Sequence, residues 1–197
     1  SKKPEHILET TRNYWSAWVN RYNFSFYGLK EKEINLFKRS LLTMRSHADD
    51  NGAIIASADS DMLQSGRDTY SYMWPRDGAF SAMTFDMAGN FSISERFYKF
   101  CARVIDDKGY LLHKYRPDDS LGSSWHPWMR NGKIELPIQE YESALVVIGL
   151  WNHYEQSKNL EFIERVYDKL VKQAADFMVS YRDKKTLLPK PSYDLWE

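Results

Sequence analysis

The most constraining feature of this sequence is a run of helical periodicity in residues 159–183, NLEFIERVYDKLVKQAADFMVSYRD. Apolar side chains recur there at intervals of three and four residues, which predicts an amphipathic helix. The members of this stripe are Ile163, Val166, Tyr167, Leu170, Val171, Ala174, Phe177, Met178 and Tyr181. Asn159 stands just before the run and is the predicted N-cap.

Helical patterns recur along the rest of the chain, whereas strand patterns do not. The predicted helices cover residues 4–21, 30–50, 75–88, 92–105, 140–155 and 159–183. Residues 52–59 form one short β-like run, and residues 106–136 form a long loop of the kind that usually carries function. No βαβ alternation and no heptad seam is present, so the predicted class is all-α.

The overall charge excludes some classes of partner. Lysine plus arginine and aspartate plus glutamate number 27 each, so no net field attracts nucleic acid or an anionic membrane surface. No run approaches 18 consecutive apolar residues, so we expect no membrane span.

Cys101 is the single cysteine, which fits a reducing compartment and a cytoplasmic location. The chain opens on SKKP without an initiating Met, which leaves secretion open.

Common catalytic motifs are missing from the sequence. It contains no Gly-rich phosphate loop, no HExxH, no CxxC and no GxSxG, so we expect no cofactor, no metal and no nucleophilic serine.

The residues with potential catalytic or binding chemistry lie instead in aromatic clusters. In YSYMWPRDGAF (residues 70–80), Arg76 and Asp77 combine the donors and acceptors that vicinal sugar hydroxyls need, beside Tyr72 and Trp74. Equally, Asp77 is placed to complement a helix dipole.

Two further aromatic clusters follow. The segment GSSWHPWMRNG (residues 122–132) suits either a binding platform or a buried plug. In PSYDLWE (residues 191–197), Glu197 adjoins Trp196. A carboxyl group packed against tryptophan loses hydration, which raises its pKa and suits a general acid for glycoside cleavage. The alternative is a solvated residue at a chain end.

Taken in order, these clusters resemble glycoside hydrolase family 15, the glucoamylase-like enzymes. The resemblance rests on YMWPRDGAF, GSSWHPW, LPIQEYESALVVIGLWNHY and LPKPSYDLWE and covers residues 51–197. It implies half of an (α/α)6 barrel (an α/α toroid) of about six helices, with long active-site loops at one end. Residues 1–50 would be the linker and opening helices.

The resemblance also implies roles for individual residues. Glu197 matches the general acid of an inverting mechanism, and Arg76 with Asp77 matches the pair that holds the non-reducing-end glucose. Trp125 matches a tryptophan at the cleavage site. The remaining pocket-lining or supporting positions are Trp74, Tyr70, Trp196 and Asp194.

The chain departs from the family pattern at two points. Tyr141 stands in PIQEYE where prokaryotic members often have an acid, and the chain ends before a second catalytic carboxylate. We therefore expect the N-terminal half of a catalytic domain, inactive alone, from an exo-acting glucoamylase-type hydrolase of α-glucans or malto-oligosaccharides. The alternatives are a trehalase or oligosaccharide hydrolase of the same family, and a non-catalytic carbohydrate-binding or scaffold module. Half a barrel would expose an apolar flank, so a homo-oligomer is possible.

Overall fold

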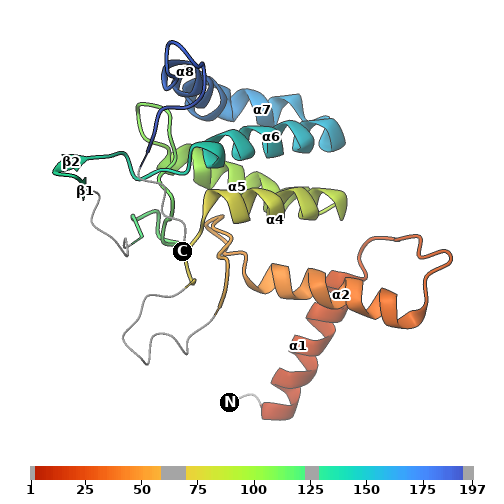
Figure 1. Cartoon of the computed structure of the whole chain (residues 1–197). Helices are drawn as coiled ribbons and strands as arrows, with labels where there is room; N and C mark the ends of the chain where they lie inside the picture. Colours follow the sequence, from red (N-terminus) through yellow and green to blue (C-terminus); the bar gives the residue numbers. More distant parts are fainter. Residues whose placement is uncertain (1–2, 59–69, 123–128, 193–197) are drawn as a thin grey trace. The chain divides into compact units, whose positions relative to one another are not determined.

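The computed structural model describes residues 3–58, 70–122 and 129–192, and the chain divides into two compact units, residues 1–46 and 47–197 (Figure 1). In the first, α1 (Pro4–Val19) begins at Pro4, as predicted, and packs against α2 (Glu31–Ser46). The linking segment inserts Phe24 and Phe26 edge-on against Phe37 of α2, with ring centroids 5.1 and 5.6 Å apart.

The second unit is built from helices that lie side by side in Figure 1. They are α4 (Pro75–Met87), α5 (Phe91–Val104), α6 (Glu140–Ser157) and a long helix formed by α7 (Leu160–Val166), η1 (Tyr167–Lys172) and α8 (Gln173–Ser180). Helix α4 packs against both α5 and α6. The side chains buried among these helices include Phe85, Phe97, Tyr98, Phe100, Leu150, Phe162 and Leu170.

The long C-terminal helix confirms the predicted stripe with one correction. Asn159 caps it as predicted, because its side chain accepts a hydrogen bond of 3.2 Å from the Phe162 N–H. Tyr167, however, is 49% exposed. Tyr167 instead borders the surface groove between this helix and α6, and the buried face of the helix advances mainly in steps of four residues. That face consists of Phe162, Val166, Leu170, Ala174 and Phe177.

Strand structure is minimal in the described part of the chain. Strands β1 (Met129–Arg130) and β2 (Lys133–Ile134) form one antiparallel hairpin inside the predicted long loop. Asn131 and Gly132 form its turn with φ values of 51° and 73°, as a type I′ turn requires. The β-like run at residues 52–59 does not form a strand over its described part; Ile54 makes an isolated bridge to Ala48. The all-α prediction is confirmed.

The loop after α5 is fastened to the end of the long helix. Gly109 has φ of 91°, and a Cβ there would lie 2.0 Å from the Gln173 carbonyl oxygen, so only glycine allows this approach. Next to it, Tyr110 packs with Ile138 and Phe177 in a small hydrophobic cluster. This contact holds the loop that continues to residue 122.

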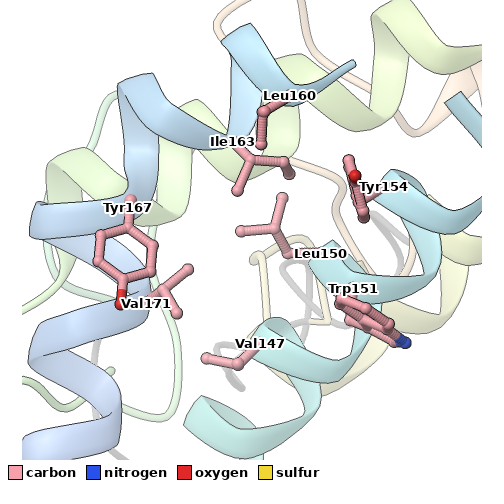
Figure 2. A pocket seen from close by; sticks show the side chains of 8 residues that line it. All are labelled: Val147, Leu150, Trp151, Tyr154, Leu160, Ile163, Tyr167 and Val171. Atoms are coloured by element: carbon pink, nitrogen blue, oxygen red, sulfur yellow. The ribbon is translucent and has the colours of Figure 1, made fainter. Parts of the chain in front are cut away.

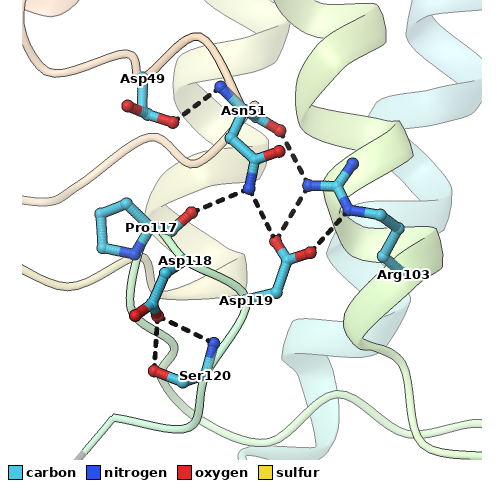
Figure 3. Close-up of polar contacts among 7 residues, drawn as sticks. All are labelled: Asp49, Asn51, Arg103, Pro117, Asp118, Asp119 and Ser120. Carbon is cyan, nitrogen blue, oxygen red and sulfur yellow. Dashed lines mark hydrogen bonds and ion pairs between the residues drawn. The ribbon is translucent and has the colours of Figure 1, made fainter.

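A polar network ties the same loop to α5 from the other side (Figure 3). Arg103 pairs with both carboxylate oxygens of Asp119, through Nε at 2.8 Å and Nη2 at 2.9 Å. Its Nη2 also donates to the Asn51 carbonyl, and Asn51 donates to Asp119 and to the Pro117 carbonyl at 3.0 Å. Two loops distant in sequence, at residues 49–51 and 117–120, are thereby joined through one guanidinium group.

None of the described helices is long and apolar enough to cross a membrane.

Candidate active site

Arg76 and Asp77 lie in the first turn of α4, at one end of the helical layer. Trp74 is extended and serves as the N-cap residue, and Pro75 begins the helix, because its fixed φ and missing N–H suit that position. Arg76 Nη2 lies 3.2 Å from Asp77 Oδ2, and both side chains remain partly exposed. The two residues therefore present a cation and an anion together to solvent, as the sequence predicted.

The first turn of α6 meets this pair. Arg76 Nη1 donates to Gln139 Oε1 at 2.9 Å and to the Tyr141 hydroxyl at 2.6 Å. Since these contacts join the starts of α4 and α6, both helices begin at the same end of the unit. The positive ends of two helix dipoles thus converge near Arg76, and the acidic residues Asp77, Glu140 and Glu142 of the first turns offset them.

These neighbours keep Arg76 charged. Burial by itself would lower the pKa of the guanidinium, but the hydrogen bond to Tyr141 and the charge of Asp77 outweigh it and raise the pKa above its ordinary value. The charge of Glu142, which is fully buried in α6, adds to this effect. The site therefore holds a permanent cation.

Aromatic rings pack beside the start of α4, next to the Arg76–Asp77 pair. The Trp74 ring lies 5.8 Å from the Tyr70 ring at an interplanar angle of 34°, and 5.8 Å from the Tyr72 ring at 80°. Lys114 is completely buried beside them, with Nζ 4.5 Å from the Tyr72 centroid and 5.6 Å from the Trp74 centroid. A lysine ammonium over two ring faces is a cation–π arrangement that fixes both rings.

Backbone pairing holds these side chains in register. Met73 and Tyr115 exchange both backbone hydrogen bonds at 2.9 Å, which places Lys114 opposite the Tyr72–Trp74 segment. The Gly122 N–H then donates to the Lys114 carbonyl at 3.0 Å. The loop that contains Trp125 therefore starts from a fixed point beside the aromatic wall.

The structure brings together part of the predicted site. Tyr70, Trp74, Arg76 and Asp77 form one cluster. The other predicted residues lie outside the part of the chain that the structure describes; they are Trp125, Asp194, Trp196 and Glu197. Ser192, the last residue before that final segment, donates from its hydroxyl to the Ile138 carbonyl at 2.8 Å. The PSYDLWE motif therefore starts next to Gln139, a direct partner of Arg76.

Sequence reasoning missed three members of the cluster: Lys114, Gln139 and Glu142. Lys114 was detectable in principle as a single cation inside the aromatic and aliphatic run from Tyr110 to Tyr115. The other two belong to the start of α6, and nothing in the sequence alone shows that this turn lies against α4. Within the described residues, no group of three or more His, Cys, Asp or Glu side chains is arranged to hold a metal ion.

Two surface cavities differ in chemistry. One of about 420 Å³ lies between the start of α6 and the end of α8 and includes Glu140, Tyr141, Tyr181 and Arg182. It adjoins the charged pair, because Tyr141 borders both. The other, of about 290 Å³, is a groove between α6 and the α7–η1 segment, with apolar and aromatic lining (Figure 2). It contains none of the predicted site residues.

Comparison with known proteins gives a consistent class. No protein-family model matches the chain. An uncharacterized glycosyl hydrolase of Methanocaldococcus jannaschii is 27% identical over 197 residues, covering 98% of this chain and 28% of that protein. A wild-type glycosidase structure aligns with a TM-score of 0.56 at 19% identity, covering 80% of this chain and 45% of that one. A glycosidase variant in complex with glucose aligns with a TM-score of 0.57 at 19% identity, covering 78% and 43%.

These comparisons establish the helical fold and a general similarity to glycosyl hydrolases. The helical fold of this chain is similar to that of solved glycosidase structures and is consistent with part of an α/α toroid, and the sequence is similar to that of a glycosyl hydrolase. The chain spans less than a third of the curated relative that it matches and less than half of the solved structures.

Proposed function

We propose that the full-length protein containing this chain is an exo-acting, inverting α-glucoside hydrolase of glucoamylase type, which releases glucose from the non-reducing ends of α-glucans. The observation that carries this proposal is the Arg76–Asp77 pair, held between the first turns of α4 and α6 beside Trp74 and Tyr70. The similarity to glycosyl hydrolases in sequence and fold supports it.

The described cluster suits a terminal sugar. The guanidinium fork of Arg76 and the carboxylate of Asp77 can bind adjacent hydroxyl groups as a donor and an acceptor. Tyr70, which is 36% exposed, offers a ring face for the apolar side of a pyranose, and the buried Trp74 ring supports it from behind. A sugar bound by these groups would be held by its non-reducing end, which corresponds to exo action.

Glu197 would supply the proton. It would protonate the glycosidic oxygen as the general acid, its pKa raised by the neighbouring Trp196. A second carboxylate beyond residue 197 would activate water from the opposite face, about 6.5–9.5 Å from the first, as inversion requires. Trp125 and Asp194 would line and support the cleavage site. The hydrogen bond from Ser192 to Ile138 supports this arrangement, because Ile138 directly precedes Gln139, a partner of Arg76.

Hydrolysis of maltose and soluble starch by the full-length protein tests the proposal. We expect glucose to appear first as the β-anomer in proton NMR, and Glu197→Gln to lower kcat by about 10³-fold, in the range for loss of a general acid. Glu155→Gln, at an exposed glutamate of α6 paired with Lys158, is the matched control and should keep wild-type activity.

Several outcomes would contradict the proposal. Full activity in Glu197→Gln would remove the catalytic assignment, and α-glucose as the first product would exclude inversion. Hydrolysis of trehalose in place of maltose would show that the protein is a trehalase and not a glucoamylase-type enzyme. Binding of maltotriose without hydrolysis would favour a non-catalytic carbohydrate-binding module.

A further inference from the structure

Tyr141 closes a hydrogen-bonded triangle with Arg76 and Gln139. Its hydroxyl accepts from Arg76 Nη1 at 2.6 Å and donates to Gln139 Oε1 at 3.3 Å. Gln139 Oε1 also accepts from the same arginine nitrogen at 2.9 Å. The Arg76 guanidinium carbon lies 5.9 Å from the centroid of the Tyr141 ring, so the tyrosine also approaches the cation with its ring.

This triangle determines how the guanidinium is turned. Nη1 of an arginine has two N–H donors, and here they serve the tyrosine hydroxyl and the glutamine carbonyl. Because the guanidinium is rigid and planar, fixing Nη1 also fixes Nη2, which pairs with Asp77 at 3.2 Å. Without the tyrosine hydroxyl, the long side chain of Arg76 would regain rotational freedom.

The chemical type of the partner also matters. A carboxylate beside Arg76 would compete with Asp77 and with sugar hydroxyls for the same cation. A hydroxyl group donates and accepts hydrogen bonds without the formal charge of a carboxylate, so Tyr141 orients the guanidinium without neutralising it. Tyr141 therefore fixes the orientation of the Arg76 guanidinium, and the positive charge stays available for Asp77 and for sugar hydroxyls.

We infer that Tyr141 is a positioning residue that holds Arg76 in the orientation needed to bind the non-reducing-end sugar. This inference rests on the proposed function. It assigns Tyr141 no contact with the reacting atoms; it acts through Arg76. Since Arg76 would hold sugar hydroxyls equally before and in the transition state, losing its orientation should affect KM more than kcat.

A double-mutant cycle in the full-length protein tests the inference. We expect Tyr141→Phe to raise KM for maltose about tenfold, as for the loss of one hydrogen bond to a charged group, while kcat changes less than about twofold. In an Arg76→Lys background the same substitution should change KM less than about twofold, because lysine lacks the planar fork. Tyr167→Phe, at an exposed tyrosine of η1, is the control and should leave KM unchanged.

Failure of this inference is separable from failure of the proposed function. An active wild-type protein with an unchanged KM in Tyr141→Phe would overturn the inference alone. Equal KM increases in the two backgrounds would do the same, because they would show a role independent of Arg76. A wild-type protein that neither hydrolyses nor binds maltose would overturn the proposed function and this inference with it.

Discussion

Arg76 illustrates how a single side chain depends on its neighbours for its chemical role. Its pKa is raised despite partial burial, because Tyr141 and Asp77 stabilise the cation. The residue is therefore charged at any working pH, and its function depends on geometry. A second cation of the same charge but different shape would not replace it.

Arg76→Lys tests the importance of that shape. Lysine retains the charge but cannot serve Gln139, Tyr141 and Asp77 from one rigid plane. We expect kcat/KM of the full-length protein for maltose to fall by about 10- to 100-fold, the range for losing hydrogen bonds to a charged group. Arg165→Lys, in the exposed ion pair with Glu161 on α7, should leave kcat/KM unchanged. Wild-type kcat/KM in Arg76→Lys would show that the fork is not used.

At the residue scale, the sequence identified the exposed half of the cluster better than the buried half. Arg76 and Asp77 were predicted because an adjacent donor and acceptor beside aromatic residues suit sugar hydroxyls, and because they match the family motif. Lys114 and Glu142 were missed because charged residues are normally expected at the surface, and both are fully buried here. Only the folded arrangement shows that the lysine lies over two aromatic rings.

Helices α5 and α6 cross so closely that one position accepts no side chain. A Cβ on Gly149 would lie 2.9 Å from the Tyr98 hydroxyl oxygen. That hydroxyl is buried and has no hydrogen-bond partner among the described residues. Burial, with the nearby charge of Asp86, raises the pKa of Tyr98 well beyond its ordinary value, so the hydroxyl stays neutral.

Gly149→Ala should therefore destabilise the packing of α6 on α5. We expect a loss of about 1–3 kcal/mol in the free energy of unfolding, as for overpacking of a core, measured by urea denaturation. In a Tyr98→Phe background the same substitution should cost less, because the clashing oxygen is gone. Equal costs in the two backgrounds would contradict the contact.

The network around Arg103 predicts a defined dependence of stability on pH. The hydrogen bonds from Arg103 lower the pKa of Asp119 below its ordinary value. A carboxyl group whose folded pKa is lowered stabilises the protein above its unfolded pKa of about 3.9, and this contribution is lost as pH falls through the folded value. Arg103→Gln should thus cost about 1 kcal/mol at pH 7, since the pair is partly exposed, and progressively less as the pH falls through the folded pKa of Asp119.

Urea denaturation at several pH values measures that difference. Lys172→Gln serves as the control, because it removes an exposed ion pair between Lys172, at the end of η1, and Asp176 of α8. It should produce little change at any pH, because solvent screens such pairs. A constant difference between wild type and Arg103→Gln from pH 7 to pH 2 would contradict the assigned ion pair.

Element prediction succeeded where periodicity is long and failed where a local deviation matters. The helix from residue 160 to 180 follows directly from its apolar stripe. Its π turn could not be predicted, because one extra residue in a turn hardly changes the sequence pattern. The exposure of Tyr167 was also missed, because apolar periodicity does not show which side of a helix borders an open groove. The hairpin at Asn131 and Gly132 was contained in the predicted loop and is too short to be recognised from strand periodicity.

The apolar groove in Figure 2 is formed jointly by α6, α7 and η1 of the second unit. Val147, Leu150, Trp151 and Tyr154 from α6 face Leu160 and Ile163 from α7, with Tyr167 and Val171 of η1 closing one side. Trp151 and Leu160 are 60% and 54% exposed. Such an exposed apolar surface favours association.

We expect the 197-residue chain on its own to self-associate through this groove. The double variant Trp151→Glu, Leu160→Lys should lower its sedimentation coefficient towards that of a monomer, because charges would have to be desolvated at the contact. Leu8→Glu, at a 71% exposed leucine of α1, is the control. A wild-type chain that sediments as a stable monomer at all concentrations would contradict the expectation.

At the scale of the whole molecule, the sequence predicted the helical class but not which helix ends meet. The resemblance of its motifs supplied the expectation of a toroid, and the fold similarity supports it. The convergence of the starts of α4 and α6 depends on tertiary packing, because α5 and the β1–β2 hairpin lie between them in the sequence. Local propensity therefore contains no information about that contact.

The contacts of Arg76 also have a consequence for the order of folding. Its two acceptors on α6 are 63 and 65 residues away along the chain. Helices can form within microseconds from local contacts, whereas such distant partners meet only after the intervening loop has closed. We therefore expect the orientation of Arg76, to which we assign sugar binding, to form after the helices, so that a partly folded protein with all its helices would not yet hold a sugar.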